Sequence, residues 1–191
     1  GTLSDSYDCK NGAATNVAND DLPSGVVVLQ EFGACSSVNG SDEGRAMMQI
    51  IHDVAPGSSQ AFHTGFVSQA EFAQGIVELA TVAQADVIVD DVGIITEPMF
   101  QDGLIAQAID QVAAMGVAYF SSAGNSARQS YESAFRDSGL DGFDGSLHDF
   151  DSGSGVDAFQ QVTIPAGGLL RIGFQWDEPF GSLGGSGSAS D

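Results

Sequence analysis

Short apolar runs alternate with longer stretches of helical periodicity from the start of the chain to about Ser126. The apolar runs predict β-strands over residues 1–4, 26–30, 59–66, 86–92 and 117–122. The longer stretches predict helices over residues 43–54, 69–84 and 103–115. Strands that alternate with helices are typical of parallel sheets. We therefore expect an α/β domain over residues 1–143, with a parallel sheet flanked by helices.

The pattern changes after Asn125. A charged stretch rich in serine and glycine comes first, and polar and apolar residues then alternate. We expect two strands, over residues 159–164 and 169–176, joined by a hairpin turn at residues 165–168. Residues 144–191 would then begin a small all-β insertion. Two to four strands do not form a stable sandwich alone, so we expect the chain to be part of a larger protein.

The composition narrows the choice of partners. The 191 residues include 26 acidic and 5 basic side chains, for a formal net charge of -21. Such a surface repels phosphate backbones and anionic lipid headgroups, which argues against nucleic acid and membranes as partners. The chain also has no apolar run near the roughly 20 residues that a membrane span requires.

The two cysteines, Cys9 and Cys35, lie in loop-like surroundings. A single pair is compatible with one disulfide in an oxidising compartment, and two free thiols are the alternative. We expect the disulfide, and with it a secreted protein.

Three short segments contain the candidate chemistry. In the first, Asp5 follows the opening strand, and ligands gather at the carboxyl ends of parallel strands. An ordinary turn aspartate is the alternative. In the second, Ser41 or Asp42 is expected to cap the helix whose first turn contains Glu43. A carboxylate there is stabilised by the helix dipole, so capping alone would also explain Glu43.

The third segment is a buried strand that ends in Ser121-Ser122-Ala123-Gly124-Asn125. It is similar to the strand that carries the oxyanion-hole asparagine in subtilisin-like serine peptidases. The helix before it, the strand over residues 86–92, and the Ala55-Pro56-Gly57 ending of the Glu43 helix follow the same order. The resemblance to the subtilisin and sedolisin group covers roughly residues 1–126, and it implies a subtilisin-like fold and proteolysis of polypeptide substrates.

The resemblance assigns a role to each segment. Asp5 matches the aspartate of the catalytic triad, and Asn125 matches the oxyanion-hole asparagine. Glu43 stands where subtilisins carry histidine, which is the sedolisin arrangement. Sedolisins place a second acid four residues later, where this chain has Met47, and they use aspartate in the oxyanion position. The chain thus mixes the two branches, and Glu43 would be the general base, with Asp5 as the neighbouring charge that raises its pKa.

The resemblance also implies a substrate cleft lined by the end of the strand over residues 86–92. The residues concerned are Asp90, Asp91, Val92 and Gly93. Asp90 and Asp91 either flank the substrate or cap the loop, and the sequence leaves both possibilities open.

The nucleophilic serine of this group lies in a Gly-Thr-Ser turn at the start of a long helix, and the chain has no such segment. Ser188 has no helix behind it and is a poor candidate. We therefore expect the chain to require the C-terminal remainder of the peptidase domain and to be inactive alone. The alternative is a non-catalytic peptide-binding module on a peptidase scaffold.

The sequence predicts no cofactor. His52, His63 and His148 lack the spacing of metal ligands. Calcium is possible in the loop that contains Asp149, Asp151 and Asp157, although an acidic turn explains these residues better.

Overall fold

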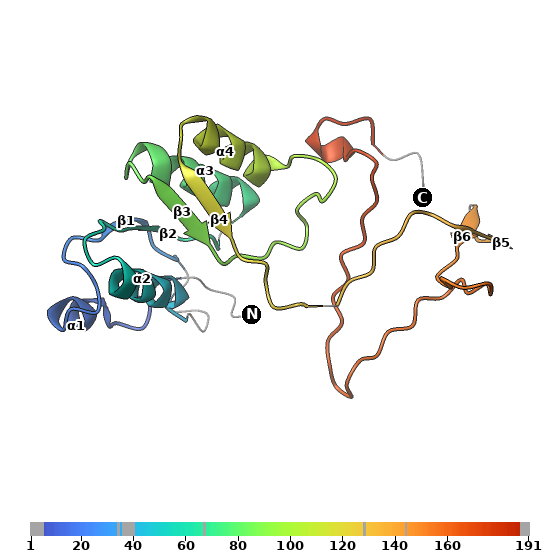
Figure 1. Cartoon of the computed structure of the whole chain (residues 1–191), viewed down its shortest axis with the longest axis horizontal. Coiled ribbons are helices and arrows are strands. Elements are labelled where there is room, and N and C mark those ends of the chain that lie inside the picture. Colours follow the sequence, from blue (N-terminus) through green and yellow to red (C-terminus); the bar gives the residue numbers. More distant parts are fainter. Residues whose placement is uncertain are drawn as a thin grey trace. The chain divides into compact units, whose positions relative to one another are not determined.

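Figure 1 shows the chain in a computed structural model that describes residues 6–33, 35, 41–66, 68–127, 129–143 and 145–187. The chain divides into two compact units, residues 1–124 and 125–191. The first unit contains the helices α1 to α4 and the strands β1 to β4: α1 (Ala13–Ala18), β1 (Val27–Gln30), α2 (Glu43–Val54), β2 (Ala61–His63), α3 (Gln69–Thr81), β3 (Val87–Asp90), α4 (Leu104–Ala114) and β4 (Ala118–Ser121).

The strands of the first unit form two parallel pairs. β1 pairs with β2 and β3 pairs with β4, and in the second pair Asp90 lies opposite Ser121. Because α2 connects β1 to β2 and α4 connects β3 to β4, each pair is a β–α–β unit, as the sequence pattern predicts. Each strand is shorter than expected, and the strand expected over residues 1–4 lies outside the described residues.

The helices follow the predicted ranges closely. α2 has the predicted bounds, while α3 and α4 end slightly earlier than predicted. α1 was not predicted, because its 6 residues are too few to establish a helical period. Ser68 caps α3 by accepting a hydrogen bond from the Glu71 amide.

Two apolar clusters hold the first unit together. The larger joins α3, α4 and β3 through six buried residues: Ile76, Ala80, Ile88, Ile105, Ala108 and Val112. The smaller joins α2 to β2 through Met48 and Phe62, with Leu22 beneath them. α3 and α4 therefore cover one face of the β3–β4 pair.

The opposite face of the β3–β4 pair is exposed. Side chains alternate between the two faces of a strand, so Ile88 points to the helices and its neighbours point away. Val87 is 58% exposed, Val89 45% and Phe120 60%. The prediction that the segment before Asn125 is a buried strand is therefore wrong for this face, because none of the described helices covers it.

The second unit contains a small antiparallel pair, β5 (Asp137–Asp141) and β6 (Ser146–His148), and a 3₁₀ turn, η1 (Gly181–Leu183). The sequence pattern predicted none of these elements. The edge of the Tyr131 ring contacts His148, and the His148 ring contacts Phe150.

The strands predicted over residues 159–164 and 169–176 are not formed, and that prediction is wrong. Their turn is present, since the Gly168 amide donates to the Pro165 carbonyl at 2.9 Å. The flanking apolar residues are exposed, with Phe159 at 81% and Phe174 at 78%. An isolated two-stranded hairpin is only marginally stable in water, so alternation without a covering layer does not produce a ladder.

None of the helices in the described part of the chain combines the length and the hydrophobicity needed to cross a membrane.

The exposed segment over residues 159–176 should be the first part of the chain that trypsin cuts. Arg171 is exposed and flanked by unpaired backbone, whereas the Arg45 side chain is 12% exposed on α2. We expect cleavage after Arg171 to be at least about tenfold faster than cleavage after Arg45, because proteolysis follows local opening. Mass spectrometry of a time course under native conditions measures both rates. Faster cleavage after Arg45 would contradict the exposed, irregular backbone around Arg171.

Candidate active site

The start of α2 has an unusual backbone at Asp42. Asp42 precedes the first helical residue, Glu43, and has φ 50° and ψ 34°, in the left-handed region. Asp42 is the N-cap residue of α2, but its carboxylate accepts no hydrogen bond from the backbone amides of the first helical turn, so Asp42 does not form the predicted side-chain cap. The residue is 4% exposed, and its carboxylate is directed to the N-terminal segment instead.

Ser6 and Asp42 form a reciprocal pair. The Ser6 hydroxyl donates to Asp42 Oδ1 at 2.7 Å, and the Asp42 amide donates to Ser6 Oγ at 3.0 Å. The Arg45 amide donates to the Ser6 carbonyl at 3.3 Å. Ser6 is fully buried. Three hydrogen bonds thus hold the residue that follows Asp5 in sequence against the first turn of α2.

Arg45, which follows Glu43 in sequence, also ties the N-terminal segment to α2. Its guanidinium lies 2.8 Å from Asp42 Oδ2 and 2.9 Å from Asp8 Oδ1, and it donates to the Tyr7 carbonyl at 2.8 Å. Burial opposes ionisation of Asp8, but hydrogen bonds from the Ala13 and Gly12 amides and the Arg45 charge together lower its pKa.

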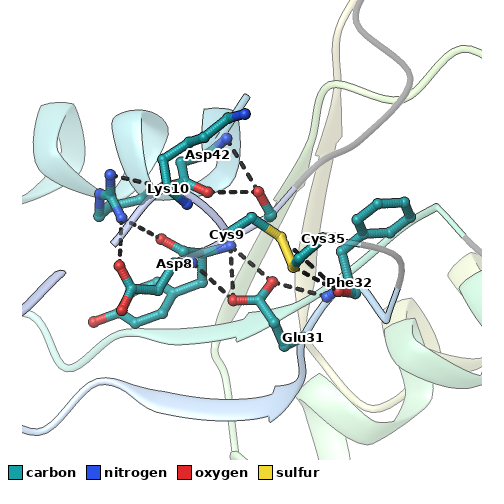
Figure 2. The surroundings of a disulfide bond; sticks show 10 residues. Asp8, Cys9, Lys10, Glu31, Phe32, Cys35 and Asp42 are labelled. Atoms are coloured by element: carbon teal, nitrogen blue, oxygen red, sulfur yellow. Dashed lines mark hydrogen bonds and ion pairs between the residues drawn. A yellow bond between two sulfur atoms is a disulfide. The ribbon is translucent and has the colours of Figure 1, made fainter. Parts of the chain in front are cut away.

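Glu31 and the disulfide anchor the other side of the N-terminal segment. Cys9 and Cys35 are joined, with 5.1 Å between their Cα atoms, which confirms the predicted disulfide. Figure 2 shows Glu31 beside it. The Glu31 carboxylate accepts from the amides of Tyr7, Asp8 and Phe32 at 2.8–3.2 Å. Cys9, Glu31 and Cys35 are close enough to ligate a metal, but the sulfurs are bonded to each other and the carboxylate is occupied by amides.

A second polar group lies at the carboxyl ends of β3 and β4. Asp90 accepts hydrogen bonds from the hydroxyls of Tyr119 at 2.5 Å and Ser121 at 3.0 Å, and from the Val92 amide at 3.1 Å. Burial, followed by the hydrogen bond to Asp90, raises the Tyr119 pKa far above its ordinary value. Burial and the Asp90 charge also raise the pKa of Glu97. Asp90 therefore holds the two strand ends together.

The remaining residues of the predicted cleft differ from Asp90. Asp91 and Gly93 are exposed, and Val92 is half-buried. A Cβ atom on Gly93 would have open space around it. The segment is irregular backbone that continues past the end of β3.

The residues carried over from the peptidase resemblance are only partly described. Asp5 lies outside the described residues. Glu43 is the first residue of α2 and is exposed, and Asn125 is exposed and begins the second unit. The gathering of Asp5, Glu43 and Asn125 in one cleft stays a prediction. Sequence reasoning missed Ser6 and Arg45, because a contact between residues far apart in sequence leaves no local pattern.

The loop considered for calcium forms an acidic turn. Asp149 accepts from the amides of Asp151 and Asp157 at 3.0 and 2.9 Å, and Asp151 accepts from the Gly153 amide at 2.7 Å. The hydrogen bonds from the Asp157 and Asp151 amides lower the pKa of Asp149. Over the described residues the three carboxylates do not gather as a set of metal ligands.

Comparison with known proteins gives no match: no protein-family model, no curated protein and no solved structure is similar to this chain. The resemblance to subtilisins and sedolisins therefore rests on the residues described above.

The low pKa of Asp8 predicts a loss of stability in acid. A carboxylate whose pKa falls below the ordinary 3.8 on folding stabilises the folded state above that pH, and this stabilisation disappears as the pH falls through the folded pKa. We expect Asp8→Asn to lower the thermal midpoint at pH 6 and to have a smaller effect at pH 2. Asp21→Asn is the control, since Asp21 accepts from the side-chain Nδ2 groups of Asn16 and Asn19 rather than from an arginine. An equal effect of Asp8→Asn at both pH values would contradict the assignment.

Proposed function

We propose that this chain is part of the catalytic domain of a secreted serine endopeptidase of the subtilisin and sedolisin group. One observation carries the proposal: the hydrogen bonds between Ser6 and Asp42 attach the segment that follows Asp5 to the start of α2, where Glu43 stands. A triad aspartate and the general base must lie side by side, and this attachment supports that arrangement for Asp5 and Glu43.

In the proposed mechanism Glu43 is the general base. It takes the proton of the nucleophilic serine as the serine attacks the substrate carbonyl, and Asp5 is its proposed neighbour in the triad. The Glu43 side chain is exposed, which is compatible with a position at the edge of a cleft.

Asn125 stabilises the reaction intermediate. It follows β4 by four residues, after the small-residue turn Ser122-Ala123-Gly124. Its amide donates to the oxyanion as the tetrahedral intermediate forms. The substrate backbone lies along residues 91–93, which continue β3. The nucleophile comes from another segment of the peptidase domain, and that remainder covers the exposed face of β3 and β4, because a doubly wound sheet has helices on both faces.

Secretion is supported by the disulfide. A bond between Cys9 and Cys35 persists in an oxidising compartment and is rare in the cytosol. The acidic surface keeps an exported protein soluble.

A second function has one observation in its favour. Met47 stands where sedolisins carry a second acid, and it is half-buried on α2. A scaffold that has lost its acid relay would bind peptides without cleaving them. Binding of an unstructured peptide without cleavage by the full-length protein distinguishes this function from the first.

Replacing the general base tests the proposal. In the full-length protein, Glu43→Gln should lower kcat on an unstructured peptide about 10²–10⁴-fold, the usual contribution of a general base. Met47→Asp is the matched control on the same helix. It adds the sedolisin acid, so we expect it to retain activity and to change the pH profile. A Glu43→Gln enzyme with full activity and a normal pH profile would refute the assignment of the base.

Replacing the oxyanion donor gives a different kinetic signature. We expect Asn125→Ala to lower kcat about 10²–10³-fold with little change in KM, because the hydrogen bond forms in the transition state rather than with bound substrate. Steady-state kinetics on the same peptide separate the two constants. A rise in KM at constant kcat would place Asn125 in substrate binding instead.

A further inference from the structure

Asp42 combines three properties that a helix cap does not require. Aspartate at this position usually accepts a hydrogen bond from an amide in the first helical turn, and Asp42 does not. Its backbone is left-handed, a conformation that a residue with a side chain keeps only where its surroundings impose it. It is also 4% exposed, although an aspartate is rarely buried without partners.

The surroundings supply those partners from the N-terminal segment and from α2. Ser6 donates to one carboxylate oxygen, and the Lys10 amide donates to the other at 2.9 Å. The Arg45 guanidinium pairs with the second oxygen at 2.8 Å. In return the Asp42 amide donates to Ser6. The left-handed backbone is what lets Asp42 use both its amide and its carboxylate on the same segment.

These contacts lie on both sides of Glu43. Asp42 precedes Glu43 and binds Ser6. Arg45 follows Glu43. Its backbone amide donates to the Ser6 carbonyl, and its guanidinium donates to the Tyr7 carbonyl and the Asp8 carboxylate. The backbone of Glu43 is therefore fixed against the segment that contains Ser6, Tyr7 and Asp8.

We propose that Asp42 is a positioning residue that holds the backbone of Glu43 against the N-terminal segment at Ser6. The inference rests on the proposed function and adds a residue to it. Asp42 does not touch the substrate. It acts through Ser6 on one side and through the peptide bond to Glu43 on the other. Loosening this attachment shifts the backbone of Glu43, and with it the alignment of the base for proton transfer.

Three substitutions in the full-length protein separate the carboxylate from the backbone. Asp42→Gly keeps the left-handed backbone, which glycine adopts freely, and removes the carboxylate. Asp42→Asn keeps the shape of the side chain but replaces the carboxylate next to Arg45 with an amide. Ser6→Ala removes the hydroxyl that donates to Asp42. The matched control is Asp8→Asn, which removes another partner of Arg45 and leaves the Ser6–Asp42 pair intact.

We expect each of the three variants to lower kcat about 10–10²-fold with KM unchanged within about twofold, since displacements near 1 Å reduce rates by such factors. Asp8→Asn should keep a kcat close to that of the wild type, because the Ser6–Asp42 pair stays intact in it. Circular dichroism and hydrogen exchange at the Lys10 and Arg45 amides check that the variants fold and that the attachment has loosened.

The outcomes distinguish the two proposals. If the wild type cleaves peptides and the folded Asp42→Gly protein keeps its kcat, the positioning role is refuted and the proposed function stands. A loss of activity in Asp8→Asn equal to that in Asp42→Gly would also refute it, since a general loosening around Arg45 would then be the cause. A wild-type protein that binds peptides without cleaving them refutes both proposals.

Discussion

The buried carboxylate of Asp42 needs hydrogen-bond donors around it, and residues of the first unit supply them. It is 4% exposed, and removing one partner of a buried ion pair typically costs about 3–5 kcal/mol. Ser6, Lys10 and Arg45 meet the requirement together. Since two of these residues belong to the N-terminal segment and one belongs to α2, the segment and the helix start are ordered by the same group. A change in either alters the surroundings of Glu43.

A second carboxylate and a covalent bond hold the same segment from the side of β1. Glu31 follows β1 and accepts three amides, two of them from Tyr7 and Asp8. The disulfide joins residues 26 apart, and closing a loop of that size contributes about 3–4 kcal/mol in the chain-entropy account. The N-terminal segment is thus fixed between β1 and α2 although it contains no regular strand among its described residues. A segment held in this way suits a catalytic residue beside it, because its position does not depend on a sheet ladder.

How much the sequence predicted depends on the range of the interactions involved. α2 was predicted to the residue, because its apolar period is clear and Ala55-Pro56-Gly57 ends it, and the parallel pairs followed from the alternation of strands and helices. α1 and the β5–β6 pair are too short for a period to establish them. The segment over residues 159–176 has the right period for strands, yet pairing also needs a covering layer. For the candidate site, the pattern placed Glu43 at a helix start and Asn125 after a strand. It predicted Ser41 or Asp42 as the cap; Asp42 holds the N-cap position, but the pattern could not show that its carboxylate binds Ser6, because Ser6 lies 36 residues away in sequence.

At the end of β3, side chains alternate between two directions, so the neighbouring acids Asp90 and Asp91 have different surroundings. Asp90 accepts from the hydroxyls of Tyr119 and Ser121 on β4 and from the Val92 amide just past β3. Both of its oxygens are thus in use, and the alternative in which it caps the loop describes it better than contact with substrate. Asp91, the next residue, is exposed, and residues 91–93 are irregular backbone after the end of β3. In the proposed peptidase this leaves substrate binding to main-chain groups and to Asp91. Of the two acids, Asp90 therefore serves the packing of the strand ends, and in the proposed peptidase any contact with substrate falls to Asp91.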